Sequence, residues 1–172
     1  MTAFRNSRGF TLVEVGIMLS IFAIVAVMAL PDIRGMMQRY QFNAAVRRAK
    51  TDLNLARLKA ISRNREVRVR VDTNGESYFM EEGNASTSST SWSTESSKTM
   101  GQGIDIFQVE GHSDDNIMFK VNGSVKDNPN DNFIGFEFRG HNATQRKRIN
   151  IETSTGRMYL QYYDSGWKDE KA

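Results

Sequence analysis

The sequence contains no cysteine, two prolines and two histidines among its 172 residues. Without cysteine the chain forms no disulfide, has no thiolate nucleophile and holds no cysteine-ligated metal. The histidines, His112 and His141, are not spaced as a metal-binding pair, so we expect no zinc site. The sequence also lacks a P-loop, a nucleophile elbow and a metal triad. We therefore expect no catalytic residues, no cofactor and no enzyme activity.

A calcium site is the alternative to a chain without metal. Its candidate ligands lie in two short segments rich in carboxylates and amides, Asp114–Asp115 and Asp127–Asn132. Calcium prefers oxygen ligands of this kind. However, Pro129 stands where an EF-hand loop would need an acid or an amide, and Asn, Asp and Pro are common in turns. We interpret both segments as turns.

Charge is distributed unevenly along the chain. Residues 32–71 carry eleven Lys/Arg against three Asp/Glu, a net of +8, whereas residues 72–138 carry three against twelve, a net of −9. The sequence pI of about 9.3 is therefore a poor guide to partners. A basic stretch followed by an acidic one favours complementary contacts between subunits at least as much as binding to nucleic acid.

Residues 10–30 form a long apolar run that contains one charge, Glu14. As a helix this run is roughly 31 Å long, about one hydrocarbon thickness of a bilayer. Arg5 and Arg8 precede it, and positive charge on a short flank holds that end in the cytoplasm. We expect a single-pass inner-membrane helix over residues 10–31, with the remainder of the chain in the periplasm.

A secretory signal peptide is the competing interpretation, because Val27–Met28–Ala29 loosely resembles a cleavage site. The apolar run is longer than the roughly 7–15 residues of a signal peptide and contains a carboxylate. A carboxylate at the centre of a membrane helix costs about 2.5–3.5 kcal/mol, and less near the interface. Glu14 either reaches lipid headgroups or meets a positive partner inside an assembly, and physics alone leaves both open.

The segment Arg8–Val15, RGFTLVEV, resembles the prepilin signature of type IV pilins and type II secretion pseudopilins. The resemblance implies that residues 1–9 are a leader and that a prepilin peptidase cuts between Gly9 and Phe10. Phe10 would then become an N-methylated terminus. The resemblance also implies that Glu14 pairs with the Phe10 amine of a neighbouring subunit.

A second helical segment follows Pro31, which falls where pilins often carry a helix-kinking proline. Apolar residues recur at spacings of three and four to about Asn64, which predicts an amphipathic stem helix over residues 32–65. These apolar residues are Phe42, Val46, Ala49, Leu53, Ala56 and Ala60. Basic side chains cover the other faces, as a solvated surface, a filament contact or an anion-binding stripe.

From residue 66 the pattern changes to that of strands. Val67–Val71 alternates strictly, and Asn74-Gly75 predicts a tight turn into a strand at Ser77–Glu82. Further strands are expected at Ile104–Val109, Asn116–Val121, Phe133–Phe138, Arg148–Glu152 and Arg157–Tyr162. The expected fold class is α+β: a long N-terminal helix packed on an antiparallel head of one or two sheets over residues 66–172.

Residues 84–99, NASTSSTSWSTESSKT, interrupt these strands. The segment has too little apolar content to pack, so we expect a flexible loop. Trp92 stands alone in it and either tucks onto the head or forms an exposed contact.

The stem end and the head together resemble the GspH/FimT family of minor pseudopilins. The resemblance rests on Leu53-x-x-Ala56-Arg57-x-x-Ala60-x-x-Arg63, on the strand Val67–Val71 that follows, and on Gly156-Arg157. It implies a β-sandwich head and a minor subunit at or near the tip of a type II secretion pseudopilus or a type IV pilus. Its partners would be the prepilin peptidase, the inner membrane and other pilins, and the subunit would be extracted into a periplasmic or surface filament.

Some members of this family bind DNA for uptake through a Gly-Arg-x-Arg motif. The corresponding stretch here, Gly156–Tyr159, lacks the second arginine. A basic patch could still contact phosphates, and its candidate residues are Arg139, Arg146, Lys147, Arg148 and Arg157. A DNA-binding minor pilin of a transformation pilus is therefore the alternative function, and a basic loop on a protein-binding head is the simpler interpretation.

Overall fold

The computed structural model describes residues 9–74, 76–110, 116–126, 133–140 and 145–170, without the side chains of residues 29–32, 108 and 110. The chain divides into two compact units, Met1–Met37 and Gln38–Ala172. Several sequence predictions lie outside the described residues: leader residues 1–8, both histidines, the two carboxylate-rich segments and the side chain of Pro31.

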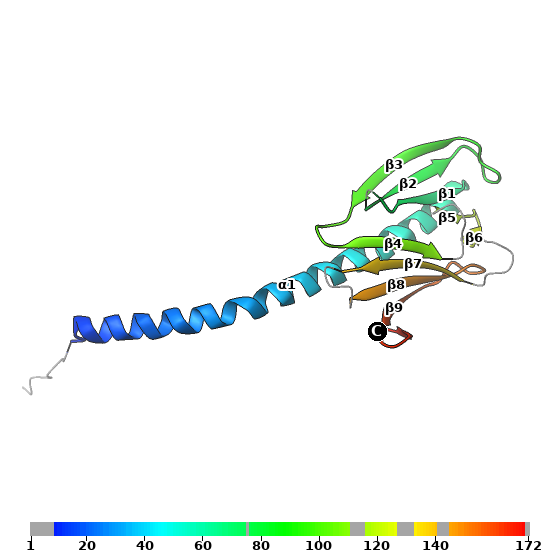
Figure 1. Cartoon of the computed structure of the whole chain (residues 1–172). Coiled ribbons are helices and arrows are strands. Elements are labelled where there is room, and N and C mark those ends of the chain that lie inside the picture. The colour runs from blue at the N-terminus through cyan, green and yellow to red at the C-terminus, as the bar shows by residue number, and fades with distance from the viewer. Residues whose placement is uncertain (1–8, 75, 111–115, 127–132, 141–144, 171–172) are drawn as a thin grey trace, which may run out of the picture. The chain divides into compact units, whose positions relative to one another are not determined.

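Helix α1 runs from Leu12 to Arg63 (Figure 1). The sequence predicted helical segments on either side of Pro31, and α1 includes both of them. A proline removes one hydrogen bond of a helix but does not by itself end a long one. The helix ends where predicted, because Asn64 adopts a left-handed conformation with φ of 51°.

The predicted apolar face of the stem is confirmed. Within the second unit, six side chains of α1 are at most 3% exposed: Phe42, Val46, Ala49, Leu53, Ala56 and Ala60. Three of these are alanines, which let the helix backbone lie close to the strands that it covers. Burial of this face, rather than helix propensity, is the main source of stability for such a helix.

The head contains two antiparallel sheets, which confirms the predicted α+β fold. Sheet A has the strand order β3-β2-β1-β5-β6, and sheet B has the order β10-β9-β8-β7-β4 (Figure 1). The strands of sheet A are β1 Val67–Asp72, β2 Ser77–Gly83, β3 Trp92–Thr99, β5 Asn116–Phe119 and β6 Val125–Lys126. Those of sheet B are β4 Asp105–Glu110, β7 Phe133–Arg139, β8 Arg146–Glu152, β9 Met158–Tyr163 and β10 Trp167–Asp169.

The core joins α1 to the inner faces of both sheets. Strand β1 alternates as predicted, with Val67, Val69 and Val71 buried. Strand β7 supplies Phe136 and Phe138, whose ring centroids are 4.3 Å apart. Phe136 also meets Tyr78 of sheet A edge-on, with centroids 6.4 Å apart. Aromatic contacts therefore link the two sheets inside one core.

The prediction of a flexible loop over residues 84–99 is wrong for its second half, which is strand β3. Ion pairs, not apolar burial, hold this strand. The Glu95 carboxylate pairs with Lys59 and Arg63 of α1, and the Arg68 guanidinium lies 4.2 Å from the centre of the Trp92 ring. Composition alone underestimates a polar strand whose charges find partners on a neighbouring element.

The first half of the same segment is held by a buried carboxylate. Glu66 is 4% exposed and accepts hydrogen bonds from the backbone N–H groups of Ser88 and Ser89, at 3.1 and 2.7 Å. Gly83 lies directly beneath, where a Cβ would stand 2.2 Å from Ser89 Oγ.

Two short strands, β6 and β10, were also not predicted, because two or three residues carry too little periodicity.

Arg57 ties α1 to a turn in each sheet. Its Nε donates to the carbonyl of Gly123 at 3.0 Å, in the β5–β6 turn, and its Nη2 donates to the carbonyl of Thr155 at 2.9 Å, in the β8–β9 turn. Gly156 has φ of +67°, and a Cβ there would lie 2.2 Å from the Gly123 carbonyl oxygen and 2.7 Å from Arg57 Nε. Glycine is therefore the residue that allows the two turns to meet on the guanidinium.

Substitution of Gly156 by Ala should destabilise the head by about 2–4 kcal/mol. The cost combines a left-handed backbone with a side chain and the loss of hydrogen bonds to a charged donor. Urea unfolding of the fragment 38–172, which contains the whole buried core, measures the change. Gly101→Ala is the matched control, because its Cβ would meet only Ile104 Cδ1 at 3.9 Å. Equal stability of the two variants would contradict the clamp.

Acidification should release β3 before the rest of the head unfolds. A hydrogen bond from Lys59 holds the pKa of Glu95 below its ordinary value of 4.5; burial opposes this shift, and a second hydrogen bond, from Arg63, reinforces it. A carboxyl with a depressed pKa contributes stability above its ordinary pKa and loses it as the pH falls through the folded pKa. We expect the protection factors of β3 amides, which correct for the intrinsic pH dependence of exchange, to fall below about pH 4.5 in the wild type.

Glu95→Gln should show these lower protection factors in β3 already at pH 7, and its protection factors should depend less on pH. Asp164→Asn, which removes an exposed ion pair with Lys168, is the control and should leave β3 exchange unchanged. Identical exchange profiles for the wild type and Glu95→Gln would sink the assignment of β3 stability to this carboxylate.

Candidate functional site

The residues of the predicted processing site precede the helix. Gly9 and Phe10 are both exposed, and Phe10 is 75% exposed. Neither belongs to α1, which begins at Leu12. The peptide bond between them therefore lies outside regular secondary structure and is exposed, as a protease substrate must be.

Glu14 has a structural role that the sequence analysis missed. The backbone N–H of Thr11 donates to Glu14 Oε2 at 3.0 Å, and the backbone N–H of Glu14 donates to Thr11 Oγ1 at 3.2 Å. This reciprocal pair is a capping box, which satisfies two N–H groups that would otherwise lack partners at the start of a helix. The spacing Thr-x-x-Glu before an apolar run is the sequence signal that could have identified it.

The helix beyond this cap presents apolar side chains on all sides. Large apolar residues between Leu12 and Met28 are 43–92% exposed. Among the described residues no single helix meets the length and hydropathy of a membrane span, whereas Leu12–Met28 and Ile33–Arg63 meet them when taken together. A surface that is apolar all round requires lipid or further protein around it.

Three of the five candidate DNA-contacting residues share the outer face of sheet B. Arg139 of β7 is paired directly with Arg146 of β8, and Arg148 lies two residues further along the same strand. Ile149 and Ile151, which alternate with these arginines, are buried on the inner face. The structure thus brings Arg139, Arg146 and Arg148 together.

These arginines already contact a buried carboxylate and aromatic rings of the head. Glu137 is fully buried, and its Oε1 accepts from Arg146 at 2.8 Å and lies 3.5 Å from Arg139 Nε. Arg148 donates to Gln161 Oε1 at 2.8 Å. The guanidinium groups also cover rings at 3.0–4.4 Å from their centres, namely Arg139 over Phe107, Arg146 over Tyr163 and Arg148 over Trp167. The head itself therefore uses much of the charge and stacking surface.

Lys147 and Arg157 are not part of the same cluster. Lys147 alternates to the opposite face of β8 and pairs with Glu170 at 2.8 Å. Hydrogen bonding to Lys147 holds the pKa of Glu170 below its ordinary value, although burial opposes the shift. Arg157 lies beside Glu152, roughly 20 Å along β8 from Arg146 at about 3.3 Å per residue. The predicted five-residue patch is thus divided among three places.

No cluster of three or more potential metal-binding side chains occurs in the part of the chain that the structure describes. The carboxylate-rich segments Asp114–Asp115 and Asp127–Asn132 lie outside that part, so the calcium alternative stays a hypothesis.

A known protein family resembles this chain in sequence, and known structures resemble it in fold. Residues 45–161 match the family described as type II transport protein GspH. No curated protein matches the sequence. The minor pseudopilin EpsH from the type 2 secretion system of Vibrio cholerae is similar in structure, with a TM-score of 0.55 and 12% identity over 73% of this chain and 98% of that one.

The type IV minor pilin FimU of Pseudomonas aeruginosa (strain PAO1) is similar as well. One crystal form gives a TM-score of 0.55 at 16% identity over 80% of this chain and 98% of that one, and a second gives 0.51 at 16% identity over 76% and 98%. At these identities the structural matches show a shared pilin-like fold. Because the family match covers more than half of the sequence and includes α1 from Ala45, sheet A, strands β4, β7 and β8 of sheet B and the Arg57 clamp, the chain belongs to the GspH family of type II transport proteins.

Proposed function

We propose that the chain is a minor pilin-like subunit that assembles at or near the tip of a type II secretion pseudopilus or a type IV pilus. One observation carries the proposal: the two units differ in what they bury. The unit Gln38–Ala172 contains the entire described core, whereas the apolar side chains from Leu12 to Met28 stay exposed. A helix of this kind is stable in lipid before assembly and against other apolar helices after it.

In this proposal, proteolysis prepares the helix to move from the lipid bilayer into a filament. A cut between Gly9 and Phe10 removes a leader that carries Arg5 and Arg8, charges that hold the N-terminus at the cytoplasmic side of the inner membrane. The new α-amine of Phe10, which is N-methylated in this proposal, lies close to hydrocarbon. Because the capping box starts at Thr11, the helix keeps its first turn after the cut.

Glu14 then couples neighbouring subunits. Its Oε2 serves its own helix cap, and an ionised carboxylate has about four lone-pair sites, so capacity remains for a second donor. An ammonium group and a carboxylate are each costly in lipid, and pairing them across a subunit boundary offsets both costs. The pair would also fix the axial position of one helix against the next.

Two substitutions separate capping from pairing. Glu14→Gln keeps a side chain that completes a capping box but removes the charge, so we expect stable membrane insertion and at least a tenfold loss from the sheared filament fraction. Thr11→Ala weakens the cap by about 0.5–2 kcal/mol but keeps the carboxylate, so filament incorporation should stay within about twofold of the wild type. Quantitative immunoblotting of membrane and filament fractions measures both.

Mass spectrometry of the filament fraction completes the test. Wild-type material should begin at a methylated Phe10. An intact leader on assembled protein, or equal incorporation of Glu14→Gln, would falsify the proposed function.

DNA binding is the second candidate, favoured by the gathering of Arg139, Arg146 and Arg148 on one face. Five free cations on phosphates would give a slope of about −4.5 in a plot of log affinity against log salt, at about −0.9 per contact. Because Glu137 and Glu170 neutralise much of this charge, we expect a slope shallower than about −2 for fragment 38–172 on duplex DNA. A slope near −4.5 that Arg146→Ala reduces would instead support DNA binding by the head.

A further inference from the structure

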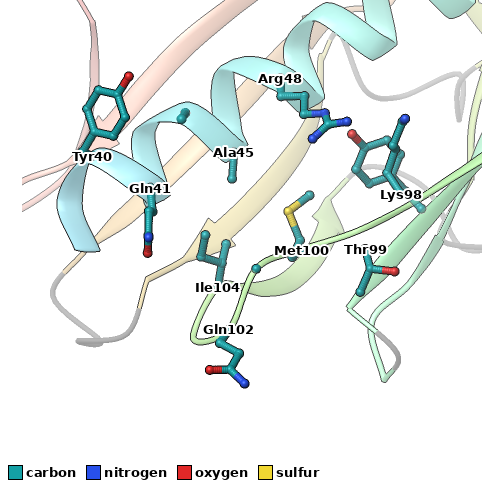
Figure 2. Close-up of a pocket in the computed structure, with 12 residues that line it drawn as sticks. Tyr40, Gln41, Ala45, Arg48, Lys98, Thr99, Met100, Gln102 and Ile104 are labelled. Carbon is teal, nitrogen blue, oxygen red and sulfur yellow. The ribbon is translucent and has the colours of Figure 1, made fainter. Parts of the chain in front are cut away.

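A groove of about 500 Å³ lies between α1 and the segment that leads from β3 into β4 (Figure 2). Its helix side presents Tyr40, Ala44, Ala45 and Arg48. The opposite wall includes Lys98 and Met100, together with Ile104. All of these residues belong to the unit Gln38–Ala172. The proposed pairing at Glu14 and the clamp at Arg57 do not use this groove.

The wall opposite the helix is fixed by backbone hydrogen bonds. The N–H of Met100 donates to the carbonyl of Glu76 at 2.8 Å, and the N–H of Ile104 donates to the carbonyl of Gly101 at 3.2 Å. Ile104 is only 5% exposed and so anchors this wall to the core. A partner would therefore find a preformed apolar surface and would not have to order it.

Two cations lie together at one end of the groove. Figure 2 shows Arg48 and Lys98 near one another, at the end opposite Tyr40. Asp52 is one helical turn from Arg48, but its Oδ2 accepts the hydroxyl of Tyr78 at 2.6 Å. No carboxylate among the described residues forms an ion pair with Arg48 or Lys98, in contrast to Arg47, Lys59 and Arg63.

The end of the groove at Tyr40 is exposed to a neighbouring molecule. Tyr40, which lies at this end of the groove and is 71% exposed, offers an aromatic contact to a neighbouring subunit.

We propose that this groove binds an acidic segment of a different, neighbouring filament subunit. A carboxylate of that segment pairs with Arg48 and Lys98, and an adjacent apolar side chain packs on Ala45, Met100 and Ile104. The inference rests on the proposed function, since it requires a filament in which a partner lies beside the head. Complementary charge sets the choice of partner, and the apolar contact supplies area.

Site-specific photocrosslinking of the full chain in its own bacterium tests the groove. A p-benzoylphenylalanine replaces Gln102, which lines the groove and is exposed, and a second chain carries the probe at Asp164, an exposed residue of the β9–β10 turn. We expect the Gln102 probe to crosslink a different pilin-like subunit, mapped by mass spectrometry to a segment with Asp or Glu within about four residues. The Asp164 probe should not give this product.

Charge reversal identifies the cause of the contact. Arg48→Glu with Lys98→Glu should reduce the Gln102 product at least tenfold, and Lys in place of the mapped acid in the partner should restore it. The urea midpoint of fragment 38–172 should be the same with and without the reversal; if it is lower, Arg48→Gln with Lys98→Gln replaces the reversed pair and should give the same loss.

The outcomes separate the two proposals. If wild-type protein still enters filaments, three results overturn the groove proposal. They are a product with lipid or with a second copy of this chain, no product at all, or a product that charge reversal leaves unchanged. Absence of wild-type protein from the filament fraction overturns the proposed function and the groove with it.

Discussion

The Arg57 guanidinium connects the three layers of the head. It lies on the helix, yet both of its described hydrogen bonds end on turn carbonyls, one in each sheet. A charged donor shared by two carbonyls is stronger than a neutral hydrogen bond, and its loss would leave both acceptors without a partner. The aromatic contact of Phe136 with Tyr78 also crosses between the two sheets. Because Gly156 has no Cβ, the two turns can approach the guanidinium this closely.

The charge asymmetry of the sequence is largely resolved within the chain. The basic stem pairs with acids of the head, as in the contacts of Arg63 with Glu82 and Glu95. Arg68 and Arg70 of β1 both pair with Glu81 of the neighbouring strand. The sequence suggested that these charges match between subunits, whereas among the described residues some of the pairs dock sheet A on α1 and others join neighbouring strands. The exceptions on the stem, such as Arg48, are therefore more informative than the net charge.

Periodic apolar patterns predicted the fold well, and isolated polar contacts were where prediction failed. The spacing of Phe42, Val46 and Leu53 was sufficient to place the stem, since burial follows the helical period directly. Strand β3 has no such period, and its order depends on partners more than twenty residues away in the chain. The same holds for the candidate site. The Gly9–Phe10 junction and Glu14 stand out locally, but the burial of Glu137 between two arginines depends on strand register.

The edges of the two sheets have a further consequence. Sheet A ends on β3, a row of hydroxyl and charged residues, and on the two-residue β6; sheet B ends on the three-residue β10 and on β4, where the register shifts between Ile106 and Gln108. Short, polar or irregular edges are poor templates for additional strands. Heads crowded side by side would thus resist merging their sheets into an aggregate. Strand β3, whose serine-rich composition resembles that of a linker, is therefore well suited to an exposed sheet edge.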